Sequence, residues 1–335
     1  MNKVLITGGS GFIGTNLVNY LVSKNYNVLN IDKINYSSTP EKFKIIKKKN
    51  NYEFKKLNLE DKKNLKKIII KFNPQFIINL AAESHVDRSI DQPFNFIINN
   101  INSTMSLFFV VNQINKKIKK KISILHISTD EVYGSKKNGT CQETDNINPS
   151  SPYSSSKASC DLIALSFIKT FKLRLSIIRL CNNYGPYQYI EKFIPLAINK
   201  LKKKQKVPIY GNGNHVREWI FVEDSCKAIE KFLKNFSPGK IYNLGSSIRF
   251  KNKEIINKII KLMNSNKNLI THVTDRPGHD LRYAICSQKF QKELNWKCKT
   301  NIDKGLLRTL RWYENNKLWI KNAENNYNYK RLGKI

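Results

Sequence analysis

The chain of 335 residues has few cysteines, and the six it has stand at positions 141, 160, 181, 226, 286 and 298, with no Cys-x-x-Cys pair. This spacing indicates neither a disulfide framework nor a zinc site, so we expect no bound metal. No apolar run approaches the roughly 18 residues that a membrane span needs. The first strand-like run begins at Val4, which leaves no room for a signal peptide. These absences predict a cytoplasmic protein with no membrane segment.

Acidic residues are also scarce, because 25 Asp and Glu stand against 59 Lys and Arg, giving a formal net charge of +34. Such an excess is typical of proteins that bind nucleic acid or an anionic membrane. The lysine runs at 47–49, 116–121 and 202–206, however, lack the interleaved aromatic residues that stack on bases. Lys, Asn and Ile are frequent throughout, which an AT-rich genome explains more simply. We therefore expect no nucleic-acid partner, and a basic surface that attracts an anionic substrate.

Short apolar runs alternate with helical segments in the first half of the chain. The strand-like runs are 3–7, 27–31, 52–57, 75–80, 121–128 and 174–180, and the helix-like segments are 12–24, 61–72, 94–115 and 152–171. This alternation predicts an α/β fold with a Rossmann-type, doubly wound parallel sheet. Beyond residue 180 the pattern loosens, with helices expected at 191–204, 252–263 and 303–320. We expect a sheet domain at 1–180 and a smaller, interleaved, mixed α+β lobe at 181–330.

A glycine-rich turn joins the first strand-like run to the first helix. Gly8, Gly11 and Gly14 let the chain turn sharply and let a pyrophosphate approach bare backbone at a helix N-terminus. Asp32 ends the second apolar run, roughly 20 residues beyond the glycines. A carboxylate there binds ribose hydroxyls and repels a 2′-phosphate, which favours NAD over NADP, although Lys33 weakens that preference. The turn therefore predicts an NAD site.

A tyrosine and a lysine at helical spacing form a second motif. Tyr153 and Lys157 lie four residues apart and share one face of a helix that Pro152 is well placed to begin. An ammonium close to a phenol stabilises the phenolate, which can take a proton from an alcohol as hydride leaves. This motif predicts alcohol oxidation next to the NAD site.

Together the Gly-x-x-Gly-x-x-Gly and Tyr-x-x-x-Lys motifs resemble the extended short-chain dehydrogenase/reductase superfamily. Further segments, which span nearly the whole chain, are similar to those of the dTDP-glucose 4,6-dehydratase family. These segments are 80–89 (LAAESHVDRS), 129–131 (TDE), 182–188 (NNYGPYQ), 191–195 (EKFIP), 210–219 (YGNGNHVREW), 222–224 (VED) and 275–280 (DRPGHD). The resemblance implies NAD as cofactor and dTDP-glucose as substrate.

The acidic pair Asp130 and Glu131 separates a dehydratase from its relatives. Epimerases of the superfamily need only redox chemistry and usually have small residues there, and the related decarboxylases lack the Asp. Two carboxyl groups in different protonation states can divide proton removal from protonation of a departing hydroxyl. The resemblance implies that Glu131 is the base at C5 and that Asp130 is the acid for the C6 hydroxyl.

The reaction that the resemblance implies is a closed redox cycle. Tyr153 takes the proton of the sugar 4-OH while hydride passes from C4 to NAD, with Lys157 lowering the pKa of Tyr153 and Thr129 binding the 4-oxygen. Glu131 then removes the C5 proton, Asp130 protonates the leaving hydroxyl, and hydride returns to C6. The products are dTDP-4-keto-6-deoxy-glucose and water, so the enzyme is a hydro-lyase that keeps its NAD.

The resemblance also assigns binding residues. Those expected to contact NAD are Gly8, Gly11, Phe12, Ile13, Gly14, Asp32, Lys33, Asn35, Tyr36, Asn58, Leu59, Leu80, Ala81, Ala82, Ser84, Asn99, Tyr153, Lys157 and Asn183. Those expected to contact the nucleotide sugar are Ser84, Thr129, Asp130, Glu131, Asn182, Lys192, Phe193, Pro208, Ile209, Tyr210, Arg217, Asn252, Asp275, Arg276 and His279. Asn58, Asn99 and Cys181 depart from the Asp, Thr and Ser usual in the family, which bears on NAD affinity and not on the reaction class.

Two other functions stay open at this point. One is a 4,6-dehydratase that acts on a GDP- or UDP-linked sugar, because the choice of base rests on few contacts. The other is a non-catalytic, basic nucleotide-binding scaffold, against which the intact Tyr153, Lys157 and acidic pair argue.

A homodimer is also expected from the resemblance. Relatives pack helices equivalent to 94–115 and 152–171 into a four-helix interface. Phe108, Phe109 and Phe167 lie on these segments and would suit that contact.

Overall fold

The computed structural model describes residues 2–46, 50–327 and 332–333, so the lysine run at 47–49 lies outside the described residues. Its centre is a seven-stranded sheet in the order β10-β6-β5-β4-β1-β2-β3, with every neighbouring pair parallel. The strands are β1 (Lys3–Thr7), β2 (Asn27–Asp32), β3 (Tyr52–Lys56), β4 (Phe76–Asn79), β5 (Ser123–Thr129), β6 (Leu175–Leu180) and β10 (Ile241–Leu244). The strand order reverses between β1 and β4, the place where ligands bind in doubly wound sheets.

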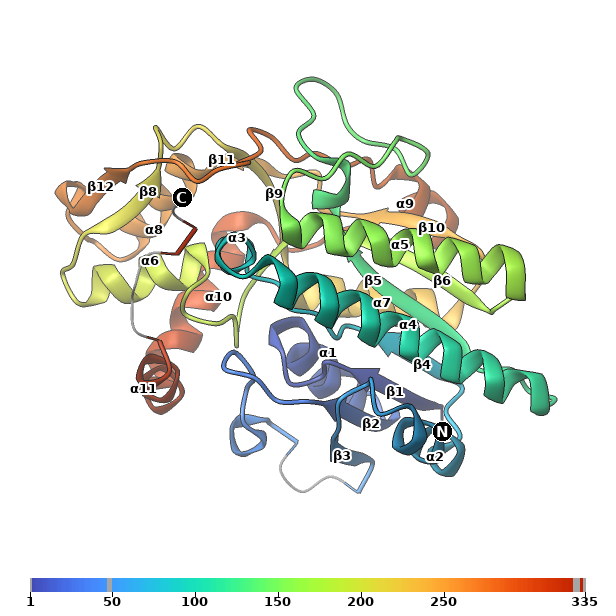
Figure 1. Cartoon of the computed structure of the whole chain (residues 1–335). Helices are drawn as coiled ribbons and strands as arrows, with labels where there is room; N and C mark the ends of the chain where they lie inside the picture. Colours follow the sequence, from blue (N-terminus) through green and yellow to red (C-terminus); the bar gives the residue numbers. More distant parts are fainter. Residues whose placement is uncertain (1, 47–49, 328–331, 334–335) are drawn as a thin grey trace.

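Helices cover both faces of this sheet (Figure 1). Leu5 and Ile6 are neighbours on β1 whose side chains enter two different hydrophobic clusters, as the alternation of a strand requires. The cluster around Ile6 includes side chains of α1 (Phe12–Ser23), α7 (Val222–Lys234) and α9 (Gln288–Leu294). The cluster around Leu5 includes side chains of α2 (Lys62–Phe72), α4 (Pro93–Lys117) and α5 (Pro152–Phe171). The predicted Rossmann-type α/β fold is therefore confirmed.

The smaller part of the molecule contains two short sheets and a core of its own. One sheet has the order β11-β9-β7 and the other pairs β12 with β8. Its elements are β7 (Asn182–Tyr184), α6 (Phe193–Lys202), β8 (Val207–Tyr210), β9 (Val216–Phe221), β11 (Arg249–Lys251), α8 (Asn252–Leu262), β12 (Ile270–Val273), α10 (Ile302–Asn315) and α11 (Lys317–Asn325). The short helix α3 (Val86–Asp91) and the 3-10 turns η1 (Glu41–Phe43), η2 (Asp130–Tyr133) and η3 (Lys267–Leu269) complete the element order.

The chain passes between the two parts more than once. After β9, the segment 222–244 returns to the large sheet, where α7 packs on α1 and β10 pairs with β6. Helix α9 then packs on β10. The chain beyond residue 180 thus contributes one strand, β10, and two helices, α7 and α9, to the layers of the large sheet.

One predicted helix, 303–320, is two helices. Helix α10 ends at Asn315 and α11 begins at Lys317, with Asn316 between them at φ −118° and ψ 47°, outside helical geometry. The side-chain amide of Asn316 donates to the carbonyl of Trp312 at 2.8 Å. An asparagine side chain that occupies a helical carbonyl competes with the backbone for it, which favours a break at this residue.

Helix α4 is the one described helix that is long and apolar enough to cross a membrane, with a mean hydropathy of 1.2 over an 18-residue window. Asparagine and serine interrupt its apolar runs, which is why no single run of the sequence approaches that length. The helix packs against α2, α3 and α5 on the face of the sheet. Phe108 is fully buried in that core, so the expectation that it lies at a dimer interface is wrong, whereas Phe109 next to it is 45% exposed.

Candidate active site

The glycine turn between β1 and α1 is closely packed on one side and open on the other. A Cβ on Gly8 (φ +70°) would lie 2.6 Å from the backbone nitrogen of Ala81, and one on Gly14 would lie 2.2 Å from the carbonyl oxygen of Gly8. Gly11, in contrast, is the N-cap of α1 without a side-chain cap, and it lines a cavity of about 300 Å³. The uncapped N-terminus of α1 therefore lies at the wall of this first cavity, where a pyrophosphate can bind.

Asp32 stands at the end of β2 on the wall of the first cavity. Its carboxylate accepts hydrogen bonds from the backbone N–H groups of Ser10 at 2.9 Å and Ile34 at 2.7 Å, which fix its orientation. Burial raises the pKa of Asp32, and these two hydrogen bonds oppose that rise. Lys33 forms an ion pair with Glu83 at 2.8 Å, so its charge is already paired.

The first cavity gathers nearly every residue expected to contact NAD. The residues on its wall are Gly8, Gly11, Phe12, Ile13, Gly14, Asp32, Lys33, Asn35, Asn58, Leu59, Leu80, Ala81, Ala82, Ser84, Asn99, Tyr153, Lys157 and Asn183. Tyr36 is not among them, because its hydroxyl donates to Glu191 at 2.9 Å and its ring lies under the guanidinium of Arg88. These residues fit an NAD molecule, with glycines at the turn and a carboxylate at the end of β2.

A second cavity of about 310 Å³ adjoins the first. The two share seven residues: Ser84, Glu131, Asn182, Asn183, Gln188, Glu191 and Lys192. Most residues expected to bind the substrate lie on its wall, namely Ser84, Glu131, Asn182, Lys192, Phe193, Pro208, Tyr210, Arg217, Asn252, Arg276 and His279. Thr129 and Asp130 line the first cavity instead. Ile209 and Asp275 line neither, since Ile209 is buried in the core and Asp275 pairs with two histidines.

The acidic pair lies where β5 ends. Thr129 is the N-cap of η2, and its hydroxyl accepts a hydrogen bond from the backbone N–H of Glu131 at 3.3 Å. Leu180, the last residue of the neighbouring strand β6, is in register with Thr129. Asn182, two residues later, therefore lies at the same edge of the sheet. One carboxylate oxygen of Asp130 and one of Glu131 are buried without a hydrogen-bond partner among the described residues. Both oxygens are therefore available to a bound molecule.

The two carboxyl groups have different electrostatic surroundings. Burial, and after it the charge of Glu131, raise the pKa of Asp130 well above its ordinary value. Burial also raises the pKa of Glu131, but Arg276, Arg217 and Lys192 oppose that rise. Three cations thus favour the ionised form of Glu131, whereas the charge of Glu131 disfavours ionisation of Asp130.

Tyr153 and Lys157 lie on the first two turns of α5. The helix begins with a capping box formed by Ser151 and Ser154, with proline at its first position. Lys157 donates a hydrogen bond from Nζ to the carbonyl of Ile127 at 2.9 Å, which places the ammonium at the end of β5. Burial, followed by the charge of Glu131, raises the pKa of Tyr153, and burial lowers the pKa of Lys157. The ionised form of Tyr153 therefore needs further positive charge in the first cavity to stabilise it.

A buried ion pair behind Lys157 escaped the sequence analysis. Asp161, one helical turn after Lys157, accepts a hydrogen bond from Nε of Arg179 at 2.8 Å, and Nη1 of Arg179 donates to the hydroxyl of Tyr133 at 2.6 Å. Arg179 lies in the otherwise apolar β6, and a charged residue in a buried parallel strand is itself a signal that a buried partner exists.

Two acidic residues that connect the walls of the cavities were also missed. Glu191 accepts hydrogen bonds from Tyr36 and, at 3.0 Å, from Nε of Arg88. Asp87 accepts hydrogen bonds from Arg276 at 2.7 Å and Tyr210 at 2.6 Å. Asp87 lies in the segment 80–89 and Glu191 in the segment 191–195, both of which are similar to segments of the family. The signal that could have identified these two acids is their position beside residues that were expected in the site.

Comparisons with known proteins agree with this geometry. A family model described as GDP-mannose 4,6 dehydratase matches residues 5–309. A probable dTDP-glucose 4,6-dehydratase of Sinorhizobium fredii is 39% identical over 99% of this chain and 98% of its own length. The dTDP-glucose 4,6-dehydratase of Salmonella typhimurium is 37% identical over 96% of this chain and 95% of its own.

Solved structures give the same result. The dTDP-glucose 4,6-dehydratase of Bacillus anthracis, in complex with NAD, has a TM-score of 0.89 and 39% identity, covering 96% of this chain and 100% of that one. The Streptomyces venezuelae dTDP-glucose 4,6-dehydratase, with NAD and TYD bound, has a TM-score of 0.90 and 33% identity, covering 96% of this chain and 99% of that one. On these full-length similarities, the chain belongs to the dTDP-glucose 4,6-dehydratase family.

Proposed function

We propose that this protein is a hydro-lyase that converts dTDP-glucose to dTDP-4-keto-6-deoxy-glucose and water. One observation carries the proposal: Glu131 lies on the walls of both cavities, with Asp130, Tyr153 and Lys157 beside it on the first. A sugar held in the second cavity at this junction meets the groups that oxidise an alcohol and the groups that eliminate water. The names of the relatives point to dTDP-glucose, although the family model is described for GDP-mannose.

The first cavity holds NAD in this proposal. Gly8, Gly11 and Gly14 present backbone to the pyrophosphate, and Asp32 binds the ribose hydroxyls. Bound NAD supplies the hydride acceptor for oxidation of C4 and the hydride donor for reduction of C6. Asn58 and Asn99 also lie on this wall, and their neutral side-chain amides offer hydrogen-bond donors and acceptors to the cofactor.

Tyr153 accepts the proton of the sugar 4-OH. The hydroxyl of Thr129 hydrogen-bonds to that of Tyr153 and lowers its pKa, in opposition to the effect of burial. Lys157 adds a positive charge one turn along the same helix face, where the carbonyl of Ile127 holds its ammonium. Proton transfer to a positioned phenolate typically contributes about 10² to 10⁴ in rate.

The elimination divides between Glu131 and Asp130. The keto group at C4 makes the C5 proton acidic, and ionised Glu131 removes it. Asp130, whose pKa is raised well above its ordinary value by burial and by the charge of Glu131, stays protonated and gives its proton to the departing C6 hydroxyl. The different surroundings of the pair thus assign one proton transfer to each residue.

Cations in the second cavity bind the diphosphate. Arg217 and Arg276 line it together with Lys192, and guanidinium groups pair well with phosphate oxygens. Arg217 donates to the carbonyls of Val216 and Asp280, and its guanidinium lies 4.2 Å from the centre of the Tyr283 ring. These contacts fix Arg217 before the substrate arrives. We propose 1–180 as the NAD-binding domain and 181–330 as the nucleotide-sugar lobe.

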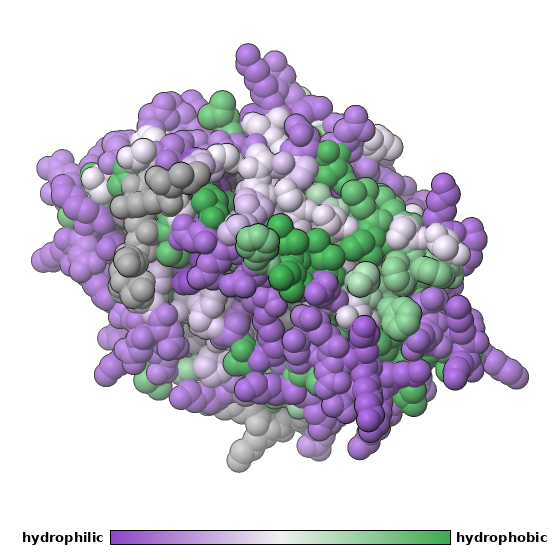
Figure 2. All heavy atoms as spheres, in the orientation of Figure 1, coloured by the Kyte–Doolittle hydropathy of each residue, from purple (hydrophilic) through white to green (hydrophobic). Residues whose placement is uncertain are grey.

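We propose that the enzyme is a homodimer joined through α4 and α5. Phe94, Ile98, Met105 and Phe109 recur at helical spacing on α4 and are all exposed, and Leu162 is exposed on α5. Figure 2 shows a hydrophobic area over these two helices. A second copy would cover this face. The compartment proposed is the cytoplasm, in keeping with six free thiols.

The first experiment is to incubate the purified protein with dTDP-glucose and assay the 4-keto-6-deoxy product by its absorbance in alkali. Product formed without added reductant is expected, because the cycle regenerates NAD. Tyr153→Phe should abolish turnover. Tyr20→Phe, whose hydroxyl donates to Glu230 outside both cavities, should not.

The same assay with GDP-mannose and UDP-N-acetylglucosamine tests the choice of base. Product from one of these and not from dTDP-glucose would keep the mechanism and change the substrate. If none of the three nucleotide sugars gives product in the presence of NAD, the proposed function is contradicted and a non-catalytic nucleotide-binding scaffold is favoured.

A further inference from the structure

Asp280 is the last residue of the 275–280 segment and lines neither of the two cavities. It is nevertheless buried, with only 7% of its surface exposed. Its Oδ2 accepts hydrogen bonds from two hydroxyl groups, that of Tyr283 at 2.7 Å and that of Ser150. A carboxylate outside both cavities affects the reaction only through the groups that it holds, and these groups lie on two sides of it.

On one side, Asp280 supports the wall of the second cavity. Its backbone carbonyl accepts a hydrogen bond from Nη2 of Arg217 at 2.8 Å. The ring of Tyr283, whose hydroxyl Asp280 holds, lies 4.2 Å from the same guanidinium. The chain then continues along β9, where the backbone N–H of Val216 donates to the carbonyl of Leu281 at 2.8 Å. Asp280 is thus fastened to the arginine that is proposed to bind the diphosphate.

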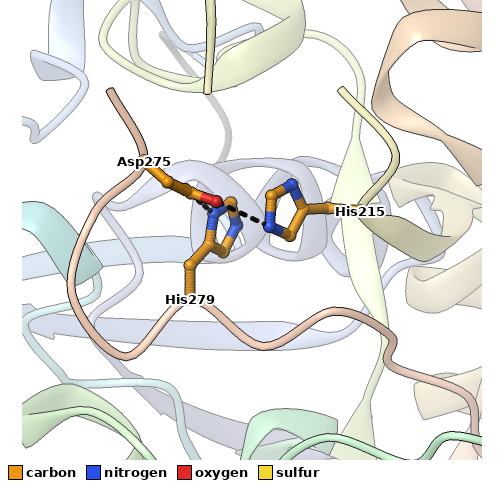
Figure 3. A group of neighbouring side chains, drawn as sticks. All are labelled: His215, Asp275 and His279. Carbon is orange, nitrogen blue, oxygen red and sulfur yellow. Dashed lines mark hydrogen bonds and ion pairs between the residues drawn. The ribbon is translucent and has the colours of Figure 1, made fainter. Parts of the chain in front are cut away.

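The start of the same segment is also held close to β9. Asp275 lies between His215, just before β9, and His279 (Figure 3). One of its oxygens is 3.0 Å from Nε2 of His215, and the other is 2.6 Å from Nδ1 of His279. The two rings are stacked, 3.6 Å apart at 14°. Because both ends of the segment are tied to β9 or its flank, residues 275–280 form one unit with the cavity wall that carries Arg217.

On its other side, Asp280 contacts the start of α5, the helix that carries Tyr153. Ser150, whose hydroxyl donates to Asp280, directly precedes Ser151, the N-cap of that helix. The segment approaches this point closely, since a Cβ on Gly278 (φ +61°) would lie 2.5 Å from the carbonyl oxygen of Ser150. The 275–280 segment therefore packs directly on the residue before the N-cap of α5.

The proposed reaction requires a fixed separation between these two sides. The diphosphate is bound at Arg217 on β9, whereas the sugar must present its 4-OH to Tyr153 on α5. Reacting atoms must stand about 3 to 3.5 Å apart, and a misplacement of 1 Å can cost about 10²-fold in rate. A contact between the two elements that hold the substrate therefore affects the rate, although it touches no reacting atom.

We propose that Asp280 is a positioning residue, which through Ser150 fixes the start of α5 relative to the diphosphate-binding Arg217. The inference rests on the proposed function, because it takes the second cavity to hold the diphosphate and Tyr153 to react with the sugar. A carboxylate suits this role, since hydrogen bonds to an ionised acceptor are about twice as strong as those between neutral groups.

Ser150→Ala tests this link by itself, because it removes one exposed hydroxyl and keeps the contact of Asp280 with Arg217. We expect kcat with dTDP-glucose to fall about 10-fold, while the affinity for dTDP alone, measured by isothermal titration, changes less than about twofold. Ser150→Thr keeps the hydroxyl and should restore kcat. Ser23→Ala is the matched control, since Ser23 is an exposed serine outside both cavities whose hydroxyl donates to the carbonyl of Tyr20.

Asp280→Ala completes a double-mutant cycle. This change removes the link to Ser150 and also the support of Arg217, so both kcat and dTDP affinity should fall. Because Ser150 acts only through Asp280, adding Ser150→Ala to Asp280→Ala should leave kcat the same within about twofold. If Asp280→Ala does not fold, the two Ser150 variants still decide, since they change an exposed side chain.

This inference and the proposed function fail in different ways. An unchanged kcat in Ser150→Ala, equal losses of kcat and dTDP affinity in that variant, or additive losses in the double variant would overturn the role of Asp280 and leave the dehydratase intact. If the wild type forms no product from any nucleotide sugar, the proposed function is contradicted and this inference falls with it.

Discussion

The guanidinium of Arg276 donates a hydrogen bond from Nη1 to Oδ1 of Asp87 over 2.7 Å. This contact joins the 275–280 segment to α3, which belongs to the other half of the chain. The second oxygen of Asp87 accepts from the hydroxyl of Tyr210 at 2.6 Å, and all three residues line the second cavity. Burial alone would raise the pKa of Asp87, but the charges of Arg276 and His85 and the hydrogen bonds from Tyr210 and Arg276 together hold that pKa below its ordinary value. Asp87 thus orients two residues of the second cavity at once.

Replacing Asp87 should be costly. Asp87→Asn leaves Arg276 largely buried without a counter-charge, and we expect a loss of about 3 kcal/mol in the free energy of unfolding. Urea denaturation measures it. Asp303→Asn is the control, because its ion pair with Lys258 is exposed and should contribute less than about 1 kcal/mol. Similar losses in the two variants would show that Asp87 and Arg276 do not depend on each other.

The role of Glu131 has a kinetic signature. Glu131→Gln keeps the shape of the side chain but cannot take the C5 proton, so oxidation at C4 should proceed and elimination should stall. Turnover should fall by about 10² to 10⁴, while the absorbance of reduced nicotinamide accumulates in a single turnover. Glu53→Gln on β3, where Glu53 is exposed and pairs with Lys55, is the control. Undiminished product formation by Glu131→Gln would show that Glu131 is not the base that removes the C5 proton.

Asp130 should make stability depend on pH in an unusual direction. Its pKa is raised in the folded protein, so the folded state disfavours ionisation. Stability is therefore greatest below the unfolded pKa of about 3.9, and falls as pH rises through the folded pKa. Asp130→Asn removes this penalty, so the melting temperature of the variant should exceed that of the wild type increasingly as pH rises. A constant or reversed difference would contradict the raised pKa.

The activity should follow the same ionisation. Asp130 must carry a proton to give it to the C6 hydroxyl, so the rate should fall as pH rises through its folded pKa. Glu131 must be ionised, so the rate should fall as pH drops through the pKa of that residue, which burial also raises. A bell-shaped profile of kcat is expected, and Asp130→Asn should lose its alkaline limb together with most of its activity.

The local motifs could be interpreted from the sequence because their chemistry lies within a few residues. The turn at Gly8 to Gly14 and the pair Tyr153 and Lys157 each depend on one strand end or one helix face. Ile209 shows the limit. The segment 207–210 is a strand, so Pro208 and Tyr210 line the cavity and Ile209 points into the core. Because no strand was expected at 207–210, the sequence could not show that Ile209 faces away from the cavity that Pro208 and Tyr210 line.

Contacts between distant segments were beyond sequence reasoning. Lys44 is fully buried behind the glycine turn, where its ammonium contacts the carbonyl of Gly9 at 3.3 Å and the carboxylate of Glu41 at 2.6 Å. In a chain with 59 basic residues, nothing near position 44 separates this lysine from those in solvent. Only the packing of η1 against the turn identifies it.

Lys44 gives a further prediction. Lys44→Met keeps the buried stem but removes the donor that holds Gly9, so the glycine turn should become less ordered. We expect NAD affinity to fall by about 10-fold, as for loss of one charge-assisted hydrogen bond. Isothermal titration of NAD-free protein measures it. Lys55→Met, in an exposed ion pair on β3, should bind NAD as the wild type does. Equal NAD affinities of the wild type and both variants would show that Lys44 does not support the cofactor site.

The exposed face of α4 tests the oligomeric state. Ile98 and Phe109 are 51% and 45% exposed on a helix whose other side forms the core, and apolar faces of this kind are usually covered by a partner. Ile98→Glu combined with Phe109→Glu places two charges in the proposed interface and should convert a dimer into a monomer in sedimentation at micromolar concentration. Leu318→Glu adds a charge at an exposed leucine on α11 and should leave the dimer intact. A wild-type monomer, or dissociation by the α11 variant alone, would mean that α4 is not the surface through which two copies meet.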